Sequence, residues 1–223
     1  MKPKRARKGT VGFLDQSQYF NEEEIAGLMS AALRAWDGKD FVPKRNAFLA
    51  ELGLSTGLRV AEMTGLDCAD LQVSGRWRSV VVRHGKGNKR RVVRVSERFK
   101  ERCLVFLETK GQAGEPVAAD SPVFRSPRTG RPLTRRALQK IFKRTAKQAG
   151  LGETRSIHAL RHTYGTQLCK ASGNNLRLVQ RQMGHNSLET TAIYLHVQDR
   201  ELDEAVEKLS EQILGKAGGT ARP

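Results

Sequence analysis

The stretch SVVVRHGKGNKRRVVRV, residues 79–95, decides the fold class, because it holds the only convincing β-strand pattern in the chain. Three valines precede the run Gly85-Lys86-Gly87-Asn88, and three more follow it within residues 92–95. β-branched residues on both sides of a glycine-containing turn are typical of a β-hairpin. We therefore expect an antiparallel hairpin with Lys86 near its tip.

Outside this hairpin, apolar residues recur at helical spacing. A helix is expected to begin after Asn21, which caps it together with Glu24, and to carry an apolar stripe formed by Ile25, Leu28, Met29 and Leu33. Further helices are expected over residues 43–54, from 58, and over 97–107, 134–149, 158–171, 176–183 and 190–195, before a last helix with the apolar face Leu202, Val206, Leu209 and Ile213. The predicted fold class is mainly α with a small antiparallel β-sheet (α+β).

The composition changes at both ends of the chain. Residues 1–20 are polar and basic without a period, which predicts a flexible arm or linker, and residues 215–223 predict a disordered tail. One ordered domain is expected between them, over residues 21–214. Four prolines between residues 114 and 132 predict a long loop, with a short strand at 122–125.

The charge of the chain indicates its partner. Forty Lys and Arg residues against 23 Asp and Glu residues give a formal charge of +17, which favours binding to a polyanion such as double-stranded DNA. The sequence has no apolar run long enough for a membrane span and no secretory signal, so a cytoplasmic protein that does not bind membranes is expected. Cys68, Cys103 and Cys169 lack the paired spacing of a zinc site or a disulfide framework, and we expect reduced thiols in the core.

Several side chains suit phosphodiester transfer, which needs a nucleophile, cations on the phosphate oxygens, a base and an acid. Arg59 and Arg161 each offer a guanidinium fork to a phosphate. His158 lies three residues before Arg161, so both are expected on one helical face. His185 follows a glycine, and Tyr194 lies nine residues further on a short polar segment.

These residues occur in five ordered blocks that resemble the catalytic blocks of tyrosine recombinases, most closely the Xer and phage-integrase branch. The blocks are Thr56-Gly57-Leu58-Arg59-Val60-Ala61-Glu62-Met63, Gly85-Lys86-Gly87-Asn88-Lys89, His158-Ala159-Leu160-Arg161-His162, Met183-Gly184-His185 and Thr190-Thr191-Ala192-Ile193-Tyr194-Leu195-His196. The resemblance spans about residues 21–197, and five blocks in order are far more specific than any one of them. It implies the fold of the DNA breaking-rejoining enzymes and makes residues 21–214 the catalytic domain.

The resemblance also implies a role for each residue. Arg59 and Arg161 would clamp the scissile phosphate, Lys86 would protonate the leaving 5′ oxygen, and Tyr194 would form a 3′-phosphotyrosyl link. His158 would accept the tyrosine proton or hold the phosphate, and His185 would donate a hydrogen bond to the transition state. Glu62 matches an acidic position that orients its neighbours. No ATP or other cofactor is expected, because one phosphoester replaces another, and no metal is expected, because the guanidiniums already neutralise the phosphate.

Plainer interpretations stand beside these roles. His84, His162 and His196 are expected to pack or cap, with His162 behind Arg161, while Lys140, Lys143, Arg144, Arg177 and Arg181 contact DNA phosphates or solvent. The last helix folds back on its own core or docks on a neighbouring protomer in a dimer or tetramer on DNA. The chain is either a fragment that lacks an N-terminal DNA-binding domain or a short member of the family. The alternative functions are DNA relaxation of the type IB topoisomerase kind and a non-catalytic DNA-binding regulator.

Overall fold

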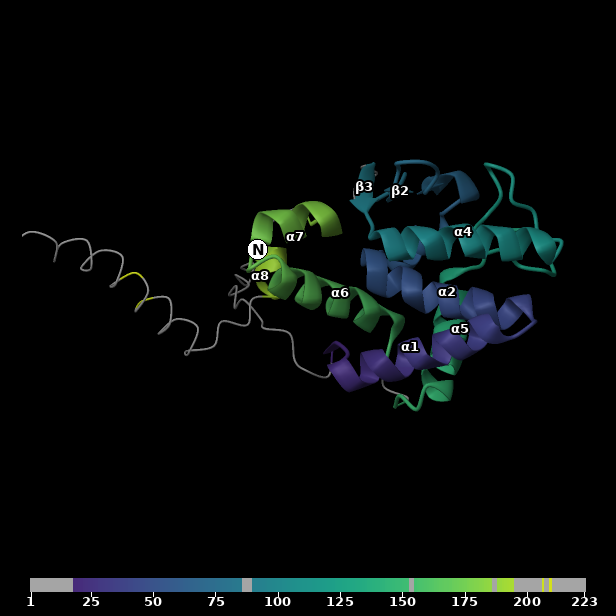
Figure 1. Cartoon of the computed structure of the whole chain (residues 1–223). Helices are drawn as coiled ribbons and strands as arrows, with labels where there is room; N and C mark the ends of the chain where they lie inside the picture. Colours follow the sequence, from purple (N-terminus) through teal and green to yellow (C-terminus); the bar gives the residue numbers. More distant parts are fainter. Residues whose placement is uncertain are drawn as a thin grey trace, which may run out of the picture.

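A computed structural model of the chain describes residues 18–85, 90–152, 155–185 and 188–194, together with Val206 and Leu209. Over these residues the protein is mainly helical and holds a three-stranded antiparallel sheet, which confirms the predicted fold class. The elements in chain order are α1 (Glu22–Asp37), α2 (Phe41–Thr56), α3 (Val60–Thr64), η2 (Cys68–Asp70), β1 (Leu71–Gln72), β2 (Ser79–Val82), β3 (Arg91–Arg94), α4 (Glu97–Gln112), α5 (Arg135–Gln148), α6 (Ile157–Ala171), α7 (Leu176–Met183) and α8 (Leu188–Ala192) (Figure 1).

Helix α2 is the centre of the main core, because it packs against α1, α4, α5 and α6 (Figure 1). Its apolar residues are buried on several sides, and Phe48 stacks on Phe106 of α4 with ring centroids 3.9 Å apart. Gly57 ends the helix with φ of +60°, a left-handed conformation that glycine adopts without strain. The chain therefore leaves α2 at Gly57 and enters the turn that carries Arg59.

The sheet has the order β1-β2-β3, and its main part is the predicted hairpin. Val80 pairs with Val93 and Val82 with Arg91 across β2 and β3. All four residues of β2 are buried, since the strand lies in the middle of the sheet. The expected tip of the hairpin, residues 86–89 with Lys86, lies outside the described residues.

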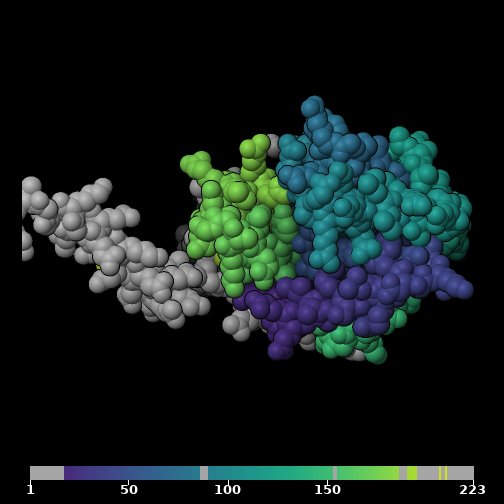
Figure 2. All heavy atoms as spheres, viewed as in Figure 1, coloured from purple at the N-terminus to yellow at the C-terminus, as the bar shows by residue number. Residues whose placement is uncertain are grey.

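A second, smaller core joins α6, α7 and the turn after α8. Its buried members are Cys169, Val179, Met183 and Tyr194. In the space-filling view, the green α6 and α7 region packs directly against the purple α1 (Figure 2). The predicted nucleophile therefore belongs to a packed cluster and not to a free loop.

Most predicted helices are confirmed, and two of their caps are confirmed in detail. Asn21 and Glu24 form the reciprocal capping box at α1, and Thr134 caps α5 by accepting from the backbone N–H of Ala137. Helix α2 begins two residues before Pro43, and α3 begins at Val60 and not at Leu58. All three cysteines are buried and unpaired.

Other expectations were wrong. No strand forms at residues 122–125 of the described chain, where only isolated bridges join Asp67 to Pro122 and Arg125 to Pro132. A proline has no backbone N–H to donate to a ladder, which explains why pairing stops there. Strand β1 was not predicted, because two residues carry no alternation that a sequence can reveal. Leu33 of the predicted apolar stripe is exposed.

The packed structure includes a residue of the predicted arm. Phe20 is fully buried, its backbone N–H donates to Thr163 Oγ1 over 2.8 Å, and its ring lies 6.3 Å from that of Phe142. Residues 1–17 and 195–205 lie outside the described residues, as does most of the predicted last helix. Of that helix, Val206 and Leu209 are described, and both are exposed.

Candidate active site

Tyr194 lies in the turn that follows α8, where its backbone N–H donates to the carbonyl of Thr191. Its side chain is only 2% exposed and rests on Gly165 of α6. A Cβ atom at Gly165 would come within 2.5 Å of the Tyr194 Cζ atom, so only glycine leaves room for this ring. The sequence Thr163-Tyr164-Gly165-Thr166 thus builds a slot for the tyrosine on the surface of α6.

Arg161 is buried one turn earlier on the same helix. Its guanidinium donates to the carbonyl of Gly57 through Nη1 and to the carbonyl of Met183 through Nη2, the second over 2.9 Å. These carbonyls end α2 and α7, so a single side chain ties the Arg59 turn to the His185 turn. Burial, and then the nearby charge of Arg59, lowers the pKa of Arg161 to about 10, and the guanidinium stays charged at neutral pH.

Arg59 is the N-cap residue of α3, and the Glu62 side chain accepts hydrogen bonds from both its backbone and its guanidinium. The Arg59 backbone N–H donates to Glu62 Oε2 over 2.8 Å, and Arg59 Nη1 donates to Glu62 Oε1 over 3.1 Å. The carboxylate is buried, whereas the Arg59 side chain is about a quarter exposed at 28%. Part of the Arg59 side chain therefore remains accessible to a ligand.

A third arginine completes this cluster. Arg91, the first residue of β3, donates to both oxygens of Glu62, from Nη1 over 2.7 Å and from Nη2 over 2.9 Å. Burial by itself would raise the pKa of Glu62, but the hydrogen bonds and charges of Arg91 and then Arg59 hold it below the ordinary value. Glu62 is thus an ionised carboxylate, which agrees with the orienting role predicted for it.

His185 follows the left-handed Gly184 that ends α7. Its ring lies nearly parallel to that of Tyr194, with centroids 5.9 Å apart, and its Nδ1 lies 3.0 Å from Thr191 Oγ1 in a hydrogen bond. Burial, followed by the charges of Arg161, Arg59 and Arg91, lowers the pKa of His185 to about 4. The imidazole is therefore neutral at pH 7.

The two histidines of α6 are placed differently. His158 is exposed in the first turn, whereas Arg161 is buried, and the His158 side chain makes no hydrogen bond to another described residue. The ring of His162 lies 6.2 Å from that of Tyr194, and its Nδ1 is buried without a hydrogen-bond partner in the described part of the chain. Burial, and then the charges of Arg161 and His158, lowers the pKa of His162.

Of the six predicted site residues, Arg59, Arg161, His185 and Tyr194 thus gather around the ends of α2 and α7. His158 lies at the edge of this group, and Lys86 is outside the described residues. Sequence reasoning missed Arg91 and the polar support of α7, in which Gln182 Nε2 donates to the carbonyl of Arg94 over 2.6 Å. One signal was available in the sequence. Arg91 lies two residues before the buried Val93, and residues two apart in a strand share a face, so Arg91 is expected on the inner face of β3.

The electrostatics of the group keep the phenol protonated in the free protein. Burial raises the pKa of Tyr194, and the charges of Arg161 and Arg59 offset only part of that increase. A phosphate placed between these arginines and the phenol would be held by charge-assisted hydrogen bonds. The arrangement is therefore suited to binding an anionic ester next to a tyrosine oxygen.

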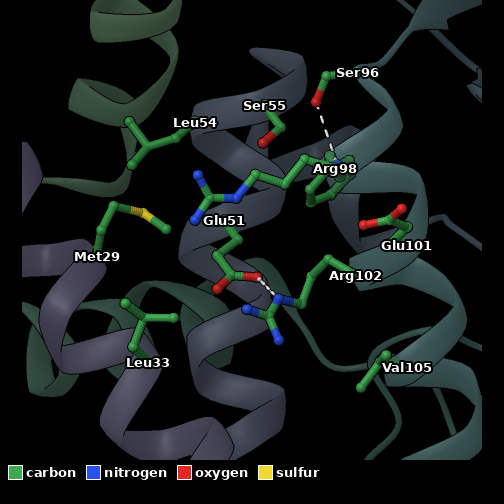
Figure 3. Close-up of a pocket in the computed structure, with 11 residues that line it drawn as sticks. Met29, Leu33, Glu51, Leu54, Ser55, Ser96, Arg98, Glu101, Arg102 and Val105 are labelled. Atoms are coloured by element: carbon green, nitrogen blue, oxygen red, sulfur yellow. Dashed lines mark hydrogen bonds and ion pairs between the residues drawn. The ribbon is translucent and has the colours of Figure 1, made fainter.

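A cavity of about 540 Å³ lies elsewhere, between α1, α2 and α4 (Figure 3). None of the predicted site residues lines it, and its floor is Glu51, which pairs with Arg102. No described helix is long and apolar enough to cross a membrane. The described residues also contain no cluster of three or more His, Cys, Asp or Glu side chains placed to hold a metal ion.

Comparison with known proteins shows the family of the chain. The profile of the phage integrase family matches residues 18–201. Tyrosine recombinase XerC of Actinobacillus pleuropneumoniae is 35% identical over 175 residues, which cover 78% of this chain and 53% of that protein. Tyrosine recombinase XerD of Halalkalibacterium halodurans is 34% identical over 176 residues, which cover 78% of this chain and 56% of that protein. The chain therefore spans about half the length of these curated relatives.

Solved structures share the fold. The XerH site-specific recombinase bound to a palindromic difH substrate, in a post-cleavage complex, matches with a TM-score of 0.69 and 29% identity, covering 86% of this chain and 53% of that one. The XerA recombinase matches with a TM-score of 0.65 and 28% identity, covering 85% and 64%. From the family profile and these relatives, we conclude that the chain belongs to the phage integrase family and is homologous to proteins named tyrosine recombinases.

Proposed function

We propose that this chain is the catalytic domain of a site-specific DNA recombinase or integrase that cuts and rejoins DNA through a covalent link to Tyr194. The observation that carries the proposal is the convergence of two guanidiniums and an imidazole on one tyrosine. Arg161 and Arg59 act on Tyr194 by charge, and the His185 ring lies against it. Homology to tyrosine recombinases supports the same reaction.

In the proposed reaction, Tyr194 Oη attacks the phosphorus of the scissile phosphodiester. The bond from phosphorus to the 5′ oxygen breaks, a 3′-phosphotyrosyl link forms, and the 5′ oxygen leaves with a proton that Lys86 supplies. Arg59 and Arg161 offset the charge of the phosphate oxygens, and His185 donates a hydrogen bond to one of them. His158 accepts the phenolic proton or holds the phosphate. Attack of a 5′ hydroxyl on the link reverses these steps and rejoins a strand without a metal or ATP.

The packing of Tyr194 adds a requirement to this reaction. A ring that is 2% exposed cannot meet a DNA phosphate until it leaves its slot on Gly165. A tyrosine is also a poor nucleophile at neutral pH, because its ordinary pKa is about 10. Release of the ring toward the arginines would both expose the oxygen and place it in a field that favours the phenolate.

Helix α5 supplies a surface for the DNA backbone. Its buried face holds Leu138, Phe142, Thr145 and Ala146, which leaves an outer face rich in Lys and Arg. No residue of this helix is acidic. We place α5, with Arg177 and Arg181 of α7, among the groups that neutralise phosphates, and binding should weaken steeply as salt rises.

Assembly on DNA belongs to the same proposal. We expect two to four protomers on paired sites, further DNA contacts from an N-terminal DNA-binding domain, and action in the cytoplasm on the nucleoid. The last helix either covers its own core or docks on a neighbouring protomer. Truncation after Arg200 separates these options, because only docking between protomers makes the truncation weaken assembly on DNA.

A covalent trapping experiment tests the function. Nicked suicide duplexes are built on the inverted repeats that neighbour the gene, so that the cleaved fragment diffuses away and the adduct persists. The wild type should become trapped, mass spectrometry should place the DNA on Tyr194, and Tyr194→Phe should bind without trapping. Tyr19→Phe, a tyrosine packed against the same small core, is the matched control and should trap normally.

Other results would give a different function. Binding without any adduct would indicate a non-catalytic regulator. Relaxation of supercoiled plasmid by a monomer that never pairs two sites would indicate a topoisomerase-like activity. An adduct that persists in Tyr194→Phe would place the nucleophile on another residue.

A further inference from the structure

We infer that Arg91 is a positioning residue of the cleavage site, which holds Glu62 with its guanidinium and supports the Gly184 turn with its side-chain stem. Arg59 and His185 are thereby set relative to Tyr194. The inference rests on the proposed function for its chemical meaning. Its structural part concerns contacts of the free protein and can be tested without DNA.

The first contact is the grip on Glu62. Two Nη atoms of Arg91 meet the two oxygens of this carboxylate over 2.7 and 2.9 Å, which is the two-pronged geometry that lysine cannot reproduce. The same oxygens accept the backbone N–H and Nη1 of Arg59. The orientation of Arg59 therefore depends on a carboxylate whose own orientation depends on Arg91.

The second contact is with the turn that precedes His185. A Cβ atom at Gly184 would lie 2.6 Å from Arg91 Cδ and 2.8 Å from its Nε. The backbone of this turn therefore rests directly on the Arg91 stem. Gly184 has φ of +65°, and it joins the last residue of α7 to His185. A shift of the Arg91 side chain would release the turn and the ring that follows it.

The third link is along the chain. Arg91 opens β3 and pairs with Val82 of β2, so it sits at the base of the hairpin whose expected tip carries Lys86. Two separate parts of the proposed site, the Arg59 turn and the His185 turn, thus meet at the Arg91 side chain, and its backbone belongs to the hairpin strands.

A direct role on the phosphate does not fit Arg91. Both Nη atoms of Arg91 donate to the carboxylate of Glu62, which offsets the charge of this guanidinium, whereas the Nη atoms of Arg161 donate to neutral backbone carbonyls and leave its charge for a phosphate. The Nε of Arg91 is buried without a hydrogen-bond partner among the described residues. Arg59, by contrast, gives Glu62 only one side-chain nitrogen and is more exposed. Arg59 is thus available to the substrate, and Arg91 holds it in place.

The kinetic test compares Arg91→Lys with Arg102→Lys. Arg102 is the matched control, because it also pairs with a buried glutamate, Glu51, but lies on α4 away from Tyr194. On the duplex that traps the wild type, Arg91→Lys should slow adduct formation by about tenfold to a hundredfold, the range that coupling within one network gives. DNA affinity should stay within about twofold, since no phosphate contact is lost. Arg102→Lys should form the adduct at the wild-type rate.

A spectroscopic test on the free protein asks whether Arg91 lies against His185. The charged or titratable groups around this ring in the described part of the chain include Arg161, Arg59, Arg91 and His162, which lower its pKa, and Tyr194, whose ring stacks on it. Removing one of these cations in Arg91→Gln should raise the pKa of His185 from about 4 toward its ordinary value, and Arg102→Gln should leave it unchanged. Imidazole resonances followed by NMR over a pH series, with His185→Gln for assignment, give this value. Urea unfolding confirms that each variant is folded, and Arg91→Met, which keeps an unbranched stem without the charge, replaces Arg91→Gln if the latter is not.

The outcomes are separable. Wild-type rates in Arg91→Lys, an equal loss in Arg102→Lys, or a loss that follows DNA affinity alone would each overturn the positioning role. If the wild type forms no adduct on any duplex, the proposed function fails, and the His185 titration then decides the structural placement. An unchanged His185 titration in the Arg91 variant would refute that placement.

Discussion

Two buried glutamates of this chain meet their arginines in different ways. Glu51, on α2, is 4% exposed, accepts one hydrogen bond from Trp36 Nε1 over 3.0 Å, and pairs with Arg102 Nε at 3.0 Å (Figure 3). The two groups form an ion pair without an aligned hydrogen bond, since Glu51 Oε2 accepts no hydrogen bond from any described residue. Glu62, at the start of α3, is 6% exposed and accepts four hydrogen bonds from two arginines.

Because of this difference, the pKa values of the two buried carboxyl groups shift in opposite directions. Burial raises the pKa of Glu51, and Arg102, Trp36 and Arg98 offset only part of the increase. The pKa of Glu62 falls below its ordinary value despite similar burial, because Arg91 and Arg59 enclose the charge. Two arginines around one carboxylate also leave a net positive charge at the Glu62 cluster, whereas Arg102 and Arg98 share their pocket with two carboxylates, Glu51 and Glu101. Such an excess charge suits a phosphate site and serves no purpose in a plain core contact.

The largest expected effect comes from neutralising each carboxylate. Glu62→Gln leaves Arg91 and Arg59 close together without their shared anion, and it should lower the free energy of unfolding by about 3 kcal/mol or more. Glu51→Gln keeps an amide oxygen for Trp36 and frees an arginine that water can reach, so it should cost about 1 kcal/mol. Urea unfolding at neutral pH measures both. Equal losses would mean that the two sites do not differ in the way described.

The second prediction tests whether the Arg91 side chain, which Glu62 holds, can move away from Gly184. Gly184→Ala forces a side chain into a left-handed backbone, at about 1–2 kcal/mol, and into the stem of Arg91, at about 1–3 kcal/mol more. Gly75→Ala is the matched control, since Gly75 has φ of +55° and a Cβ atom added there would meet nothing within 4 Å among the described residues. The difference between the two unfolding free energies isolates the contact. A difference near zero would show that Arg91 moves aside freely.

The smallest expected effect is a pair of opposite pH dependences. Glu62 has a lowered pKa, so its contribution to stability is present above about 4.5 and is lost as the pH falls through the lowered value. Glu51 has a raised pKa, so its contribution is present below 4.5 and is lost as the pH rises through the raised value. The measured quantity is the unfolding free energy of the wild type minus that of each Gln variant, from about pH 3 to pH 8. As the pH rises, this difference should increase for Glu62→Gln and decrease for Glu51→Gln. Parallel curves would contradict the comparison.

Much of the fold could be read from local patterns. The capping box at Asn21, the cap at Thr134 and the valine-rich hairpin each depend on residues close in sequence, and each is confirmed. The errors fall where local pattern is weak or misleading. Strand β1 has two residues, and the expected strand at 122–125 contains Pro122.

For the candidate site, the order and spacing of the motifs are enough to indicate Arg59, Arg161, His185 and Tyr194. Spacing did not separate His158 from Arg161 in burial, because residues three apart on a helix share a face only approximately. It also gave no reason to join Arg91 to Glu62, which lies 29 residues away. Their pairing depends on how β3 packs beside α3.

Residue types and near neighbours are enough to give the chemical inventory, the helical and strand periods, and the basic charge that favours DNA. Three properties need the folded chain: Tyr194 rests in a slot on Gly165, the pKa of Glu62 is lowered while that of Glu51 is raised, and Arg91 joins two turns. Burial and long-range hydrogen bonding set these properties, and both depend on which distant segments come together.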